Sequence, residues 1–266
     1  MILVTGATGN IGRLVVDELL AAGATDVRAL TNKPEKAALP PQVEVVRGYI
    51  GRPETLGGVF DGVEKMYLAP LESTVGEVTA MAVKAGVRYI VDVSGPKDSW
   101  WAPVATAVEE SGAAWTHLSP GEFMDNMLVW AEQIRTTGQV RDGYPGAANA
   151  PIDMADIAAV AAKVLLTDGH AGKEYLLTGP ETLTRAEMVR HIGAALGREI
   201  PLVEVSHEEA VAVLEPAMGE FARWYVDGMR DLVQHPQEAN RLVEEITGRP
   251  ATTFAQWARK KADAFR

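Results

Sequence analysis

The residues that most clearly predict chemistry lie at the start of the chain, in a turn with three evenly spaced glycines. The turn reads Thr5-Gly6-Ala7-Thr8-Gly9-Asn10-Ile11-Gly12. Gly6 permits a tight strand-to-helix turn, Gly9 lets a pyrophosphate approach the backbone, and Gly12 lets the helix press against the sheet. The following helix N-terminus offers unpaired N–H groups and a partial positive charge to phosphates. The turn therefore predicts dinucleotide binding through Gly6, Thr8, Gly9, Asn10, Ile11 and Gly12, with a ligand-free tight turn as the alternative.

The elements that would position this turn alternate over the first 120 residues. Short apolar runs predict buried parallel strands, at Met1–Thr5, Val27–Thr31, Val43–Val46, Lys65–Leu68, Tyr89–Val93 and Trp115–Leu118. Helical patterns lie between them, at Asn10–Ala22, Pro53–Phe60, Val75–Ala85 and Val104–Ser111. This alternation predicts an α/β fold, a Rossmann-type doubly wound parallel sheet with right-handed crossovers.

After Pro120 the alternation breaks down. The patterns predict helices and two strands, at Met124–Thr136, Asp156–Leu166, Glu174–Thr178, Arg185–Leu196 and Leu202–Val205, followed by a mostly helical last fifty residues. We therefore expect an NAD(P)-binding Rossmann domain over residues 1–150. Residues 151–266 are expected to form a smaller, mostly helical C-terminal substrate lobe, interleaved with the sheet.

Composition excludes several classes of function. The 266 residues carry a formal net charge of −11 and include no cysteine. The acidic balance argues against phosphate neutralisation on nucleic acid, and the missing thiols exclude disulfides and cysteine chemistry. The five histidines show no metal-like spacing, so no metal site is expected. No apolar run approaches the roughly 18 residues of a membrane helix, and the N-terminus lacks a signal-peptide pattern. A cytoplasmic monomer or homodimer that acts on a small molecule is expected.

Several motifs resemble one family. The G-x-x-G-x-x-G spacing is similar to that of extended and atypical short-chain dehydrogenase/reductase proteins. Six further stretches resemble the NmrA-like group over essentially the whole chain: VRALTNKPEKA, GVEKMYLAP, WTHLSPGEFMDNM, IDMADIAAVAAKVL, YLLTGPETLTRAEM and ITGRPATTFAQWARK. The resemblance implies an NAD(P)(H)-binding protein. The group comprises reductases of quinones, dyes and phenylpropanoid ethers, isomerases, and catalytically silent redox sensors.

Cofactor choice is expected at the end of the second strand. An acidic residue there would bind the ribose 2′-hydroxyl, whereas a basic one would pair with a 2′-phosphate. Asn32 and Lys33 stand there without an acid, which favours NADP(H) over NAD(H). The resemblance further implies that Tyr49 and Ile50 meet the adenine, and that Ala69 and Pro70 lie along the nicotinamide ribose.

The proton donor is harder to predict. Short-chain reductases normally use a Tyr-x-x-x-Lys pair after the fifth strand. No tyrosine lies between Tyr89 and His117. Ser94 ends the fifth strand and is our candidate catalytic residue, with a strand-end hydroxyl that caps backbone as the alternative. Lys97 and Asp98 follow as further acids or bases, or as solvated loop charges.

Substrate contacts are expected beyond the carboxyl ends of the strands. The candidates there are Trp100, Trp101, His117, Phe123, Met124 and Asn126. His117 has a second interpretation as a partly buried structural histidine. Phe221, Trp224 and Tyr225 are alternatives for a roof over the pocket, or for core.

Three functions fit these residues. The first is NAD(P)H-dependent reduction of a small conjugated acceptor (quinone-, dye- or polyketide-like), which needs little acid help because the acceptor delocalises charge. The second is a non-catalytic, redox-sensing regulatory protein. The third is a non-redox isomerase or cyclase.

Overall fold

The chain forms two compact units in the computed structural model, which describes residues 1–96, 99 and 101–266. Unit 1 comprises Met1–Pro120, Met154–Leu177 and Leu242–Arg249. Unit 2 comprises Gly121–Asp153, Thr178–Arg241 and Pro250–Arg266. This division differs from the expected boundary at residue 150, because a helix and a strand beyond residue 153 return to the sheet of unit 1.

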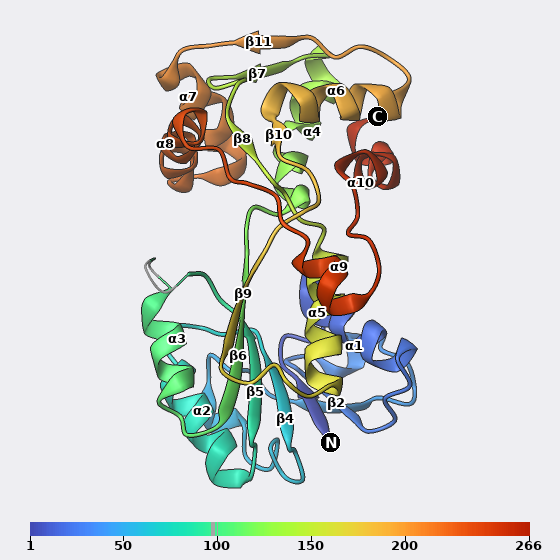
Figure 1. Ribbon diagram of the computed structural model, residues 1–266, viewed down its shortest axis with the longest axis vertical. Coiled ribbons are helices and arrows are strands. Elements are labelled where there is room, and N and C mark those ends of the chain that lie inside the picture. The colour runs from blue at the N-terminus through green and yellow to red at the C-terminus, as the bar shows by residue number, and fades with distance from the viewer. Residues whose placement is uncertain (97–98, 100) are drawn as a thin grey trace. The chain divides into compact units, whose positions relative to one another are not determined.

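Unit 1 is built on a seven-stranded sheet in the order β3-β2-β1-β4-β5-β6-β9 (Figure 1). All six neighbouring pairs are parallel. The strands are β1 (Ile2–Val4), β2 (Val27–Thr31), β3 (Glu44–Arg47), β4 (Lys65–Leu68), β5 (Tyr89–Val93), β6 (Ala114–Pro120) and β9 (Lys173–Leu177). The order reverses between β1 and β4, which is where a doubly wound sheet opens a crevice for a ligand. The predicted Rossmann-type fold class is confirmed.

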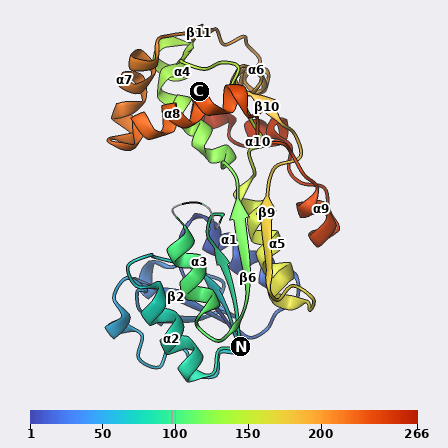
Figure 2. The ribbon, with the colours of Figure 1, turned by 60° about the vertical axis from the view of Figure 1, so that its left-hand side comes forward.

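Helices cover both faces of this sheet (Figure 2). On one face α1 (Asn10–Ala21) packs on α5 (Met154–Leu166), with α9 (Leu242–Thr247) beside it. The other face carries α2 (Val75–Ala85) and α3 (Ala102–Glu109). The helix predicted at Pro53–Phe60 is wrong: only a 3-10 turn forms, η2 (Pro53–Thr55). Leu56, Val59 and Phe60 fill the core from the irregular segment that follows, so their apolar pattern reflects burial and not a helix.

Unit 2 is mostly helical and has two small cores. One core gathers η3 (Met124–Trp130), α4 (Ala131–Thr137), α6 (Arg185–Leu196), α10 (Phe254–Lys260) and η4 (Ala262–Phe265) around buried Trp130 and Trp257. The other joins α7 (His207–Met218) and α8 (Phe221–Gln234). Two short strand pairs complete the unit: β7 (Val140–Asp142) with β11 (Leu202–Glu204), and β8 (Ala148–Asn149) with β10 (Leu183–Thr184).

Local sequence sets several of these helix starts. α6, α7 and α10 each begin at a capping box, in which a Ser or Thr side chain and a Glu or Gln side chain bond reciprocally to backbone N–H groups. The helix expected at Met124–Thr136 is divided, since its first half is the 3-10 helix η3 and only its second half is α-helical. In the part of the chain that the structure describes, every helix is too short or too polar to cross a membrane.

Candidate active site

The glycine-rich turn connects the end of β1 to α1, as predicted. Gly6 adopts φ +60°, a conformation that favours glycine. The Gly9 N–H donates to the Gly6 carbonyl at 2.8 Å and closes the turn. The Ala69 N–H donates to the Thr5 hydroxyl at 2.8 Å, which ties the turn to the segment after β4. The turn is thereby held at the carboxyl ends of β1 and β4, the two strands between which the strand order reverses.

The other two glycines keep α1 close to this turn. A Cβ on Gly12 would collide with the Gly6 carbonyl, and one on Gly9 would lie 3.2 Å from the same oxygen. Gly12 is buried, whereas Gly9 and Asn10 are exposed and Ile11 is half-buried. α1 has no side-chain N-cap and no acidic residue in its first turn, so its first N–H groups are available to an anion. We call the turn, packed against the open start of α1, the glycine cradle. Close packing of turn and helix, with unpaired N–H groups at the helix start, is the arrangement that receives a pyrophosphate.

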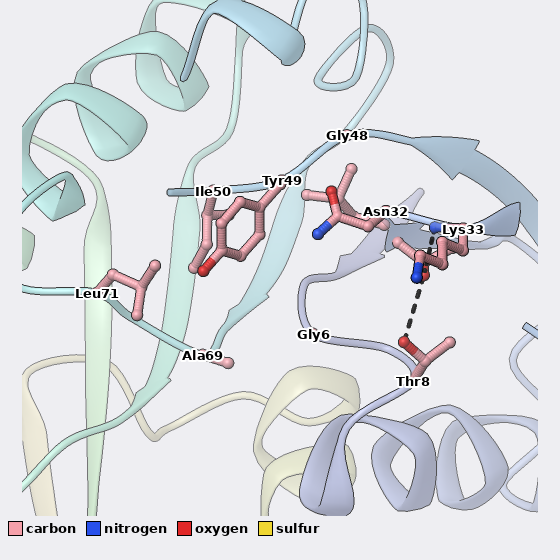
Figure 3. Close-up of a pocket in the computed structure, with 11 residues that line it drawn as sticks. Gly6, Thr8, Asn32, Lys33, Gly48, Tyr49, Ile50, Ala69 and Leu71 are labelled. Atoms are coloured by element: carbon pink, nitrogen blue, oxygen red, sulfur yellow. Dashed lines mark hydrogen bonds between the residues drawn. The ribbon is translucent and has the colours of Figure 1, made fainter. Parts of the chain in front are cut away.

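A pocket of about 300 Å³ opens beside the turn (Figure 3). Seven of the twelve residues predicted to bind the cofactor line it, namely Gly6, Thr8, Asn32, Lys33, Tyr49, Ile50 and Ala69. Four lining residues were not predicted: Leu30, Thr31, Gly48 and Leu71. Pro70 lies between two lining residues without lining the pocket itself, while Gly9, Asn10, Ile11 and Gly12 belong to the turn and helix beside it.

One wall of the pocket carries basic charge. Asn32 and Lys33 follow β2 directly, and Thr31 at its end lies 3.3 Å from the Thr8 hydroxyl, oxygen to oxygen (Figure 3). Arg47 ends β3 in register with Thr31, and its guanidinium donates to the Asn32 carbonyl at 3.0 Å and to Glu35 at 2.9 Å. A backbone hydrogen bond and the contact with Arg47 lower the pKa of Glu35. Arg47 was missed because its place beside Asn32 follows from strand pairing and not from a motif.

The opposite wall is apolar. Ile50 is buried, and Tyr49 is 39% exposed with its ring directed into the pocket space near Ile50 (Figure 3). The Tyr49 N–H donates to the Thr55 hydroxyl at 3.0 Å, which fixes the turn after β3. The Arg52 guanidinium lies 5.9 Å from the centre of the Tyr49 ring. A flat ring beside an aliphatic side chain is a surface on which an adenine can stack.

The candidates after β5 are buried or half-buried, or they lie outside the described residues. Ser94 is 4% exposed. Trp101 is half-buried, and its ring would be struck by a Cβ on Gly95, so it covers the backbone beside Ser94. Trp100, Lys97 and Asp98 lie outside the described residues.

His117 corrects our expectation of a substrate contact. Its side chain is 1% exposed, and both ring nitrogens face carboxylates: Nδ1 lies 2.6 Å from Asp92 Oδ2, and Nε2 lies 3.2 Å from Glu109 Oε1. Burial disfavours its charged form, but the two carboxylates outweigh that effect and raise its pKa. The interpretation as a buried histidine therefore describes its position better than a place in a substrate pocket.

The candidates after β6 belong to unit 2. Met124 is 1% exposed in the first core of that unit, so it cannot line an open pocket. Phe123 is half-buried and Asn126 is exposed, and the Asn126 amide donates to Glu122 at 3.4 Å. Of the proposed roof residues, Phe221 and Trp224 are 64% and 65% exposed, whereas Tyr225 is buried.

No group of three or more acidic or histidine side chains with metal-binding geometry occurs among the described residues. The glycine cradle and the pocket at the reversal of strand order define a Rossmann-type, dinucleotide-binding protein.

Comparison with known proteins narrows this class. A family model described as NAD(P)H-binding matches residues 6–103. The chain is 35% identical to a (4-alkanoyl-5-oxo-2,5-dihydrofuran-3-yl)methyl phosphate reductase of Streptomyces griseus, and 34% identical to an NAD(P)H azoreductase of Xenophilus azovorans. Each alignment covers 100% of this chain and 99% of the relative. Its fold matches the crystal structure of an NADPH-dependent quinone oxidoreductase from Escherichia coli with a TM-score of 0.86 and 25% identity, over 98% of this chain and 99% of that one.

The chain belongs to the NAD(P)H-binding, NmrA-like family of atypical short-chain dehydrogenase/reductase proteins.

Proposed function

We propose that the protein is an NAD(P)H-dependent reductase of a small, conjugated organic acceptor. The observation that carries this proposal is the glycine cradle opening onto the pocket at the reversal of strand order. Relatives that align over their full length are named as reductases of an unsaturated lactone phosphate and of azo compounds. An electron-poor double bond conjugated to a carbonyl or aromatic system is common to these acceptors.

Different residues of the chain would bind different parts of the cofactor. Gly6, Gly9 and the first N–H groups of α1 would hold the pyrophosphate, because the cradle leaves backbone donors exposed. Tyr49 and Ile50 would hold the adenine, and Ala69 would lie along the nicotinamide ribose. A bound NAD(P)H supplies a hydride from its nicotinamide ring. The correct orientation of acceptor and cofactor would then supply most of the rate enhancement.

The preference for NADP(H) remains part of the proposal. Lys33 and Arg47 stand beside Asn32, at the position where a 2′-phosphate would be recognised. Glu35 works against them, since its carboxylate already engages Arg47. We expect tighter binding of NADPH than of NADH in fluorescence titrations, and a clear preference for NADH would contradict this.

Turnover tests the reductase directly. Purified protein is mixed with NADPH and, in separate reactions, a quinone, an azo dye, a cationic triphenylmethane dye and an α,β-unsaturated lactone. We expect NADPH oxidation that depends on at least one of these acceptors. Tight NADPH binding without acceptor-dependent oxidation would instead favour a redox-sensing protein. A product at the oxidation state of its substrate would favour a non-redox enzyme.

A further inference from the structure

A row of acid, imidazole and acid is buried inside unit 1, apart from the nucleotide pocket. Asp92 on β5 is 0% exposed, His117 beside it on β6 is 1% exposed, and the Glu109 side chain on α3 is 27% exposed. The Trp115 ring stacks on the imidazole with ring centres 4.2 Å apart. The row therefore leads from a partly solvated carboxylate to a fully buried one. A dry cluster of this kind is costly unless protons are shared within it.

The inner end of the row points toward the candidate catalytic serine. Ser94 and Asp92 are two residues apart, and the alternation of a strand places such residues on the same face. The Ser94 N–H donates to the Leu118 carbonyl at 3.0 Å, which continues the pairing of β5 with β6. Asp92 Oδ1 and the Ser94 hydroxyl are both buried and have no hydrogen-bond partner within the part of the chain that the structure describes. Two unsatisfied polar atoms at one end of a bonded row indicate a place for a transferable proton.

Ser94 also lies level with the nucleotide pocket. Leu68 on β4 pairs with Asp92 on β5. Ala69 and Leu71, which line the pocket, therefore follow one strand, and Ser94 follows the strand next to it. The carboxyl ends of these strands are where a doubly wound fold carries out its chemistry.

Polar groups near the row come from the strands on both sides of it. Ser119, next to His117 on the same face of β6, donates to Glu174 of β9 at 2.9 Å. Tyr67 of β4 and Asp92 interact through their charges, and burial raises the Tyr67 pKa. Burial also raises the pKa of Asp92, against the hydrogen bond and the charge of His117 and the proximity of the Ser94 hydroxyl. The carboxylates of Asp92 and Glu109 are thus the two acids joined to the imidazole.

We propose that Glu109, His117 and Asp92 conduct a proton from solvent to the Ser94 hydroxyl, which protonates the acceptor after hydride transfer. This proposal rests on the proposed reductase activity. The acceptor gains two electrons and one hydrogen nucleus as hydride from NAD(P)H, which is oxidised. The resulting anion takes the Ser94 proton, and the serine oxygen regains a proton from Asp92. His117 then reprotonates Asp92, Glu109 reprotonates His117, and solvent reprotonates Glu109. One proton therefore enters the row from solvent for each proton that leaves with the product.

Two kinds of acceptor separate proton delivery from hydride transfer. An α,β-unsaturated lactone needs a proton after it takes the hydride, whereas a cationic triphenylmethane dye is neutralised by the hydride alone. We expect Ser94→Ala to lower the ratio of lactone rate to dye rate by about 100-fold, within the usual range of general acid catalysis. Glu109→Gln should lower the same ratio by about tenfold and alter the pH profile of lactone reduction only.

Glu110→Gln is the matched control, because Glu110 is an exposed carboxylate directly after Glu109. It should leave the ratio unchanged. If Ser94→Ala and Glu109→Gln slow the reduction of lactone and dye equally, or slow neither, the proposed proton transfer along the row is wrong. A wild-type protein that reduces no acceptor would overturn the reductase instead.

Nitrogen NMR of the His117 imidazole tests the row without turnover. We expect the imidazole pKa in the wild type to lie above its ordinary 6.5, and that in Glu109→Gln to be lower than in the wild type, because the second carboxylate is then lost. A His117 pKa in the wild type that is not raised, or one that is unchanged in Glu109→Gln, would overturn the proposal.

Discussion

At the scale of single residues, the close approach of α1 to the glycine turn depends on glycine, which has no Cβ. A Cβ on Gly12 would meet backbone, the Gly6 carbonyl, which cannot move aside like the end of a flexible side chain. Gly76 in α2 is the contrasting case, because a Cβ there would meet nothing within 4 Å. The same change of glycine to alanine should therefore have opposite effects at these two positions.

We expect Gly12→Ala to lower the free energy of unfolding by about 1–3 kcal/mol through overpacking. It should also weaken NADPH binding at least tenfold, because α1 must shift away from the turn. Gly76→Ala should raise stability by up to about 1 kcal/mol, since alanine restricts the unfolded chain more than glycine does. Urea denaturation and fluorescence titration measure both effects, and equal stabilities of the two variants would contradict this account.

Cofactor choice is also decided by single side chains. Arg47→Gln removes a charge beside Asn32 and should weaken NADPH binding about fivefold to tenfold, with little effect on NADH. Glu35→Gln should act in the opposite direction, because it frees the Arg47 guanidinium for a phosphate. Arg88→Gln is a suitable control, since Arg88 is exposed just before β5, at the opposite edge of the sheet from the pocket. Similar losses for NADPH and NADH in Arg47→Gln would contradict a role at the 2′-phosphate.

At the scale of elements, the contact of β5, β6 and α3 depends on pH. The pKa of His117 lies above its ordinary 6.5, and that of Asp92 lies above its ordinary 3.8. Both groups hold their protons more tightly in the folded state than in the unfolded state. The stability they contribute is present at low pH and is lost as pH rises above each ordinary value and through the raised one.

We therefore expect wild-type stability to decrease from pH 6 upward, with a shallower decrease in His117→Asn. Thermal or urea denaturation at several pH values measures the slope. His235→Gln, which replaces an exposed imidazole, should keep the wild-type slope. If His117→Asn keeps it too, the row does not control the pH response.

At the scale of the whole molecule, the two units have different buried charges. In unit 2, Arg185 is 2% exposed, and its Nε and Nη2 atoms each lie 2.8 Å from Asp142 Oδ2. Its guanidinium also lies 4.7 Å from the centre of the Trp130 ring and donates to Tyr225. Tyr225 in turn donates to Glu122 at 2.5 Å. Removal of one partner leaves the other charge buried without compensation.

We expect Asp142→Asn to destabilise the protein by about 3–5 kcal/mol. Glu208→Gln, in an ion pair of the same unit with exposed partners, should have little effect on stability. Below its unfolding temperature, Asp142→Asn should bind NADPH like the wild type, because the nucleotide pocket lies in unit 1. Calorimetry and NADPH titration give both quantities, and loss of NADPH binding by the folded variant would contradict that assignment.

Much of the fold could be predicted because its signals are local. Strand and helix patterns up to Pro120 follow from runs of apolar residues and from glycine stops, and α2 and α6 have the predicted bounds. The helix prediction at Pro53–Phe60 failed because a buried irregular segment and the buried face of a helix contain similar apolar residues. The turn of three glycines was predictable because the whole motif, Thr5–Gly12, occupies eight consecutive residues.

The sequence alone determined the class of protein, because a glycine-rich turn between a strand and a helix carries its own chemistry. The neighbours of that turn depend on how the strands and helices pack. The pairing of β3 with β2 places Arg47 against the backbone of Asn32, which lines the pocket. His117 is buried in a row with Asp92 and Glu109. Residues 8 to 25 positions apart meet in these contacts. Strand register and helix packing set such neighbours, and no local pattern records them.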